Sequence, residues 1–100
     1  MRYIVVDEDR GVFLGSFNQY ALFAKNDILG STKAFSFDTR DEAEEYIENV
    51  FSKNKNAECK VIEIEAKNKY VRVEDIIKQG YGMYTHYLVD NLPMQSDSFH

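Results

Sequence analysis

The sequence has few of the residues that build disulfides, metal centres and catalytic pairs. Its 100 residues include one cysteine, two histidines, one proline and no tryptophan. A single cysteine, Cys59, excludes an internal disulfide and any zinc site built from several cysteines. The two histidines, His86 and His100, indicate neither a metal site nor an acid–base pair. We therefore expect no cofactor, no metal and no enzymatic activity.

Motifs for common catalytic and phosphate-binding sites are missing as well. The chain contains no phosphate-binding glycine loop, no G-x-S-x-G and no H-E-x-x-H. Asp7-Glu8-Asp9 does not have the alternating ligands and central glycine of a calcium loop, so these acids predict a hairpin turn. Cys59 begins a predicted strand without a neighbouring histidine, which is typical of a packed thiol rather than a nucleophile.

Long hydrophobic runs are also missing. The apolar run at the amino terminus stops at Asp7, too early for the hydrophobic region of a signal peptide or for a bilayer span. We therefore expect a cytoplasmic protein with no membrane partner. A chain of 100 residues, 44% of them hydrophobic, is long enough for one domain with a buried core. The expected domain covers residues 1–93, followed by a loose tail over 94–100.

The most regular pattern lies between residues 38 and 51 and predicts an amphipathic helix over 40–52. Five apolar residues recur there at helical spacing and form one stripe: Ala43, Tyr46, Ile47, Val50 and Phe51. Thr39 and Glu42 match the S/T-x-x-E capping box, in which each side chain bonds a backbone amide of the other residue. The pattern therefore predicts both the start of the helix and the side that faces a core.

The opposite face of this helix is acidic. Six acids and one base lie between Asp38 and Glu48, a local charge of −5 that equals the formal net charge of the whole chain. Such a face is either a solvated surface or a contact surface for a basic protein, because its field speeds encounter with cations. The candidate partner-binding residues are Asp41, Glu44, Glu45 and Glu48.

Alternation and β-branched residues predict the strands of a sheet. The predicted strands cover residues 2–7, 12–17, 33–37, 59–66, 70–73 and 83–89. Gly11 suits the positive φ of the first turn, and residues 18–32 are predicted as a loop with a short packed segment. A second, short helix over 74–79 has Ile76 and Ile77 facing inward and ends at Gly80.

These elements predict a single α+β domain. We expect a mainly antiparallel sheet of four or five strands, with the 40–52 helix packed on one face and the 74–79 helix beside it. Phe35, Phe37, Ile62 and Ile64 are expected to form the surface under the longer helix. The predicted core consists of Ile4, Val6, Phe13, Phe35, Phe37, Ala43, Tyr46, Ile47, Val50, Ile62, Ile64, Ile77, Tyr87 and Val89.

A second group of residues supports an alternative function, nucleic-acid binding. The segment Gly80 to Tyr87 carries interleaved aromatic residues, as does the RNP1 strand of RNA-recognition motifs. Gln79, however, stands where that motif has Lys or Arg. The residues concerned are Lys67, Lys69, Tyr70, Arg72, Tyr81, Tyr84 and Tyr87. A net charge of −5 makes this alternative the weaker one, because phosphate contacts require Lys and Arg. A third alternative is a homodimer whose aromatic strand is its self-interface.

Residues 1–51 combine three segments: the hairpin Tyr3-Ile4-Val5-Val6-Asp7 and Gly11-Val12-Phe13-Leu14-Gly15, the strand Lys33-Ala34-Phe35-Ser36-Phe37-Asp38-Thr39, and the helix opening Arg40-Asp41-Glu42-Ala43-Glu44-Glu45-Tyr46-Ile47. This order of elements resembles that of small uncharacterised accessory proteins of tailed bacteriophages. The resemblance implies an accessory protein that binds and modulates a host or defence component in the host cytoplasm, with no shared catalytic residues. The first functional hypothesis is therefore a small acidic protein-interaction module, acting as a modulator or inhibitor.

Overall fold

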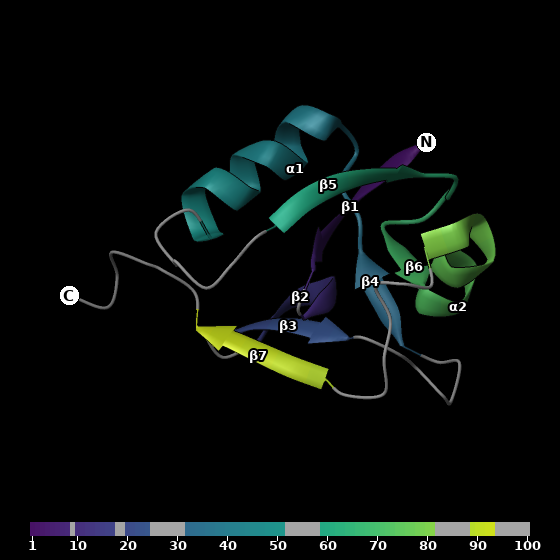
Figure 1. Cartoon of the computed structure of the whole chain (residues 1–100). Coiled ribbons are helices and arrows are strands. Elements are labelled where there is room, and N and C mark those ends of the chain that lie inside the picture. Colours follow the sequence, from purple (N-terminus) through teal and green to yellow (C-terminus); the bar gives the residue numbers. More distant parts are fainter. Residues whose placement is uncertain (9, 18–19, 25–31, 52–58, 82–88, 94–100) are drawn as a thin grey trace.

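The chain forms two antiparallel sheets. The computed structural model describes residues 1–8, 10–17, 20–24, 32–51, 59–81 and 89–93 (Figure 1). The larger sheet contains β1 (Arg2–Asp7), β2 (Gly11–Phe17), β3 (Tyr20–Ala24), β5 (Cys59–Ile64) and β7 (Val89–Pro93), in the order β5-β1-β2-β3-β7. The smaller sheet pairs β4 (Lys33–Phe35) with β6 (Tyr70–Arg72). The predicted α+β class and the mainly antiparallel sheet are confirmed.

Two short helices complete the fold. Helix α1 (Arg40–Tyr46) continues into a π-helical turn, η1 (Ile47–Phe51), and α2 (Val73–Ile76) continues into η2 (Ile77–Tyr81). Gly80 has a φ of 97° and a ψ of 7°, so it ends the second helix in the left-handed conformation, as predicted. Among the described residues, none of the helices has the length and apolar character needed to cross a bilayer.

Both faces of the larger sheet are covered, because consecutive residues of β1 point to opposite sides. Ile4 and Val6 pack in one hydrophobic cluster with residues of β4, β6 and α2, whereas Val5 packs in a second cluster with α1. The first cluster contains Ile4, Val6, Val12, Ala34, Ile62, Ile64, Val71 and Ile76. The second contains Val5, Phe13, Ala21, Phe23, Phe37, Ala43 and Phe51. The prediction took account of the α1 face but not of the layer on the other side.

Two predictions about the core are therefore wrong: the side on which Ile62 and Ile64 pack, and the burial of Ile77. Ile62 and Ile64 belong to the cluster on the side of α2 and do not form the surface under α1. Ile77 is 37% exposed, because Ile76 takes the inward position of the short helix. Of the remaining predicted core, four residues are half-buried against the α1 cluster, namely Phe35, Tyr46, Ile47 and Val50. Tyr87 lies outside the described residues.

The sheet also contains a strand that the sequence analysis placed in a loop. Residues 20–24 form β3, which pairs with β2 on one side and with β7 on the other. The described part of the last strand begins at Val89, where the predicted strand ends, and residues 83–88 and 94–100 lie outside the described ranges. Strand β4 ends at Phe35, earlier than predicted, because Phe37 leaves the small sheet and forms an isolated bridge with Tyr3.

The packing of α1 predicts how two substitutions on its apolar side differ in stability. Phe51 is 2% exposed and its ring contacts Phe13, Phe23 and Tyr46. Phe51→Ala should lower the free energy of unfolding by about 3–5 kcal/mol. Ile47 is only half-buried, so Ile47→Ala should lower it by less than half as much. Urea denaturation followed by circular dichroism measures both, and equal losses would contradict this packing.

Candidate functional site

Helix α1 begins where the capping pattern places it. Thr39 has an extended backbone, and its Oγ1 accepts the backbone N–H of Glu42 at 3.1 Å. Among the described residues, the Glu42 side chain does not accept the backbone N–H of Thr39 in return. One of the two bonds of the predicted capping box is therefore present. Asp41 and Glu42 lie in the first turn, where carboxylates complement the positive end of the helix dipole.

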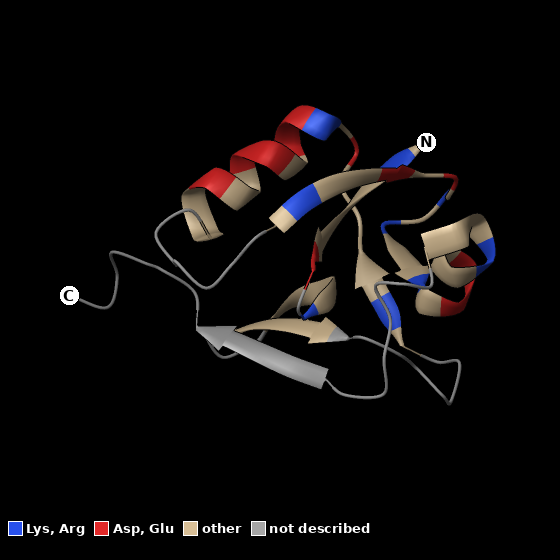
Figure 2. Ribbon diagram, viewed as in Figure 1, with Lys and Arg blue, Asp and Glu red and all other residues tan. Residues whose placement is uncertain are grey.

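The acidic residues of α1 and η1 point away from the sheet. Ala43 and Phe51 are buried, while all four predicted partner-binding residues are exposed: Asp41, Glu44, Glu45 and Glu48. Figure 2 shows acidic residues along α1 and η1, a basic residue where α1 begins, and further basic residues on β5 beside the helix and around β6 and α2. We call this surface of four carboxylates the acidic face.

A shallow groove borders the acidic face on each side. On one side, Glu42, Glu45 and Asn49 line a groove whose other residues are aromatic, namely Phe35, Phe37 and Tyr46. On the other side, Glu44 and Ile47 line a groove with Arg40, Cys59, Lys60 and Val61. The acidic face is therefore a ridge between an aromatic groove and a mixed one.

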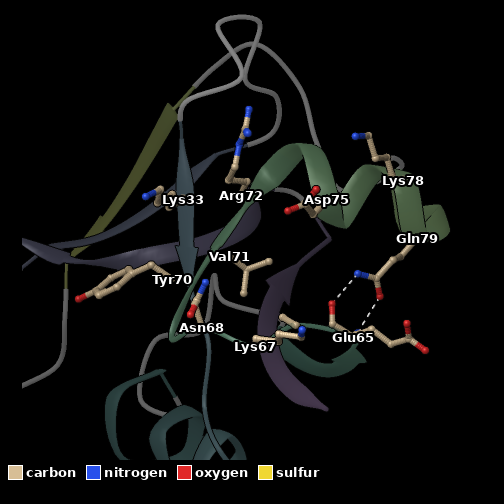
Figure 3. Close-up of a pocket in the computed structure, with 11 residues that line it drawn as sticks. Lys33, Glu65, Lys67, Asn68, Tyr70, Val71, Arg72, Asp75, Lys78 and Gln79 are labelled. Atoms are coloured by element: carbon tan, nitrogen blue, oxygen red, sulfur yellow. Dashed lines mark hydrogen bonds between the residues drawn. The ribbon is translucent and has the colours of Figure 1, made fainter.

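The residues of the alternative nucleic-acid site are only partly brought together. Lys67, Tyr70 and Arg72 line one pocket, which also contains Lys33 and Lys78 (Figure 3). Lys69 lies beside it, with its Nζ 5.8 Å from the centre of the Phe35 ring. Tyr81 instead packs against the core, and Tyr84 and Tyr87 lie outside the described residues. Lys33 was missed because it is distant from the Tyr-rich segment in sequence, and Lys78 was missed because it lies in the predicted 74–79 helix, outside that segment.

Buried Asp7 and the half-buried residues Arg10 and Cys59 form a polar group at the first hairpin. Asp7 is fully buried, and its Oδ1 accepts the backbone N–H of Arg10 at 3.0 Å, as expected for a turn-forming acid. Its Oδ2 lies 3.4 Å from Nη1 of Arg10 and 3.9 Å from Sγ of Cys59. Asp9 lies outside the described residues, whereas the predicted hairpin is present, with Asp7 opposite Gly11.

This environment keeps Cys59 in its thiol form. Burial, reinforced by the negative charge of Asp7, raises the pKa of Cys59 from 9.0 to about 12. The thiolate is the nucleophilic form of cysteine, so almost none of it is present at neutral pH. Within the described ranges there is also no group of three His, Cys, Asp or Glu residues that could hold a metal ion.

Comparison with protein-family models, with curated proteins and with solved structures finds no match to this chain.

The raised pKa of Cys59 predicts slow alkylation. At pH 8, iodoacetamide should react with the folded protein at least about tenfold more slowly than with the urea-unfolded chain, because each pKa unit lowers the thiolate fraction tenfold. The rate should keep rising above pH 9. Asp7→Asn should speed the reaction in the folded state by removing the nearby charge. Cys59→Ser gives the background, and equal rates for folded and unfolded protein would contradict the prediction.

Proposed function

We propose that this protein is an interaction module that binds the basic surface of another protein through the acidic face of α1. The observation that carries the proposal is the lack of an ion pair at three of the four acids of this face, as far as the structure describes the chain. Within the described part of the chain, Asp41, Glu44 and Glu45 form no ion pair. Acids elsewhere do: Asp38 pairs with Arg2 at 2.5 Å, and Glu74 pairs with both Arg72 and Lys78.

The spacing of these acids also opposes helix stability. Asp41 and Glu45 are four residues apart, as are Glu44 and Glu48, so each pair places like charges side by side. Such pairs destabilise a helix by roughly 0.2–0.5 kcal/mol each. A basic partner surface would remove this repulsion when it binds. The spacing of the acids, which does not help the helix to fold, would therefore favour binding.

The aromatic groove beside the acidic face adds a place for the apolar parts of a partner. Phe35 and Tyr46 are half-buried and lie next to Glu42 and Glu45. Lysine and arginine side chains pack their methylene stems and charged heads on such surfaces, through apolar contact and cation–π attraction. The groove therefore suits a partner whose contact surface carries Lys or Arg.

The proposed role is binding rather than catalysis. The protonated Cys59 thiol is a poor nucleophile, and among the described residues the acidic face borders two open grooves and no enclosed site. The resemblance to phage accessory proteins makes a host protein the first partner to test, and modulation or inhibition of that protein the effect to measure.

The test compares two variants with the same change in net charge. One carries Glu44→Gln, Glu45→Gln and Glu48→Gln on the acidic face. The control carries Glu8→Gln just after β1, Glu63→Gln on β5 and Glu65→Gln just after β5, all three of them exposed. Both variants and the wild type are immobilised and exposed to nuclease-treated bacterial lysate, so that nucleic acid cannot bridge proteins to the surface.

A partner of the acidic face should be captured by the wild type and the control and lost with the first variant. Once that partner is purified, its association rate with the first variant should be lower by at least about tenfold at low salt, because electrostatic steering is removed. The difference should shrink at high salt. If both variants capture the same proteins in the same amounts, the acidic face is only a solvated surface.

A further inference from the structure

The outer face of the small sheet carries one pair of cations and one pair of aromatic rings. The antiparallel register places three pairs of residues side by side: Lys33 with Arg72, Ala34 with Val71, and Phe35 with Tyr70. Ala34 and Val71 point into the core and are 0% and 5% exposed. Because side chains alternate along a strand, the other two pairs share the outer face.

The cation pair is unfavourable for folding. Like charges directly opposite each other on neighbouring strands destabilise a sheet. Arg72 forms an ion pair with Glu74 at 2.7 Å, but Glu74 is half exposed and is shared with Lys78 at 3.3 Å. Lys33 forms no ion pair in the described part of the chain. An anion between Lys33 and Arg72 would turn this repulsion into binding energy.

Tyr70, the exposed member of the aromatic pair, is also left open to a ligand. Tyr70 is 55% exposed, although its ring is held at 5.7 Å from that of Phe35 in an edge-to-face arrangement. An edge-to-face contact occupies the edge of one ring and leaves ring faces available. Exposed aromatic faces beside cations are the arrangement that proteins use to stack the bases of single strands.

A pocket of about 380 Å³ lies beside the small sheet next to α2 and η2, with Lys33, Tyr70 and Arg72 among its lining residues, whereas the Tyr70 ring points away from Lys78 and Gln79 (Figure 3). Lys67 and Lys78 add positive charge to its lining, against the carboxylates of Glu65 and Asp75. One side of the pocket is fixed, because the Gln79 amide donates to the Glu65 carbonyl and accepts from the Glu65 N–H, both at 2.8 Å (Figure 3). These two bonds hold η2 against the end of β5.

From this juxtaposition we infer that the outer face of the β4–β6 sheet binds a nucleotide unit, with its phosphate between Lys33 and Arg72 and its base on Tyr70. The strand direction supports this orientation. Phe35 lines the aromatic groove beside α1, so it is the end of β4 nearest the acidic face. Lys33 lies two residues further away, about 7 Å along the strand, which separates the phosphate from the carboxylates of α1.

The test uses a fluorescein-labelled ten-nucleotide oligo-dT and the whole chain, followed by fluorescence anisotropy. Unlabelled oligo-dT of the same length, thymidine monophosphate, inorganic phosphate and a poly-glutamate peptide serve as competitors. Tyr70→Ala and Lys33→Gln alter the site. Tyr20→Ala and Lys60→Gln are the matched controls, because Tyr20 is 45% exposed on β3 and Lys60 is exposed on β5.

The wild type should bind the oligonucleotide, and more weakly as salt is raised. Tyr70→Ala should lower the affinity about tenfold, as expected for the loss of one stacked base. Lys33→Gln should lower it similarly while leaving the melting temperature unchanged or higher, because the repulsion with Arg72 is removed. Both control variants should bind as the wild type does.

The competitors identify the source of the nucleotide. Displacement by thymidine monophosphate at concentrations close to those of unlabelled oligonucleotide indicates a free nucleotide, and displacement only by the longer strand indicates single-stranded nucleic acid. Both results support the inference. It is overturned if neither ligand binds, if Tyr70→Ala binds as tightly as Tyr20→Ala, or if poly-glutamate or inorganic phosphate displaces the oligonucleotide as well as the nucleotide does.

Discussion

The fold depends on two hydrogen bonds between Tyr3 and Phe37. Strand β2 pairs with the carboxyl-terminal half of β1, at Val6 and Asp7, and leaves the other half of that edge open. The Tyr3 N–H donates to the Phe37 carbonyl at 3.0 Å, and the Phe37 N–H donates to the Tyr3 carbonyl at 2.8 Å. Because buried backbone groups must be paired, this bridge fixes where the chain passes from one face of the sheet to the other.

Ser36 secures the same crossing from the other side. It is fully buried, its N–H donates to the Lys69 carbonyl at 2.7 Å, and its Oγ accepts from Nε of Arg2. The residues before it form β4 and those after it start α1. One short crossing therefore places the cation pair of the small sheet and the acidic face of α1 on separate layers of the molecule.

Local patterns were sufficient for the elements whose signal lies within a few residues. The alternation of Ile62 and Ile64 predicted β5, and the apolar stripe behind Thr39 predicted α1.

Strand β3 was missed because its five residues are almost all apolar and show no alternation to distinguish a strand from a packed loop. The double burial of Ile4, Val5 and Val6 was missed because a continuous apolar run does not tell which layers cover it. The pairing of Lys33 with Arg72 joins residues far apart in sequence. The periodicity of side chains within one strand does not predict which other strand it pairs with.

The net charge of the chain was a poor guide to its surfaces for a related reason. A value of −5 averages the acidic face with the rest of the molecule, yet charges on a protein surface act over only about 10 Å in 0.1 M salt. Lys67 and Lys78 line the same pocket as Arg72, and the register of β4 and β6 brings Lys33 into this group. A phosphate at this site would meet these local charges and not the average. A domain that is acidic as a whole can therefore present a basic pocket on one layer and an acidic helix on another.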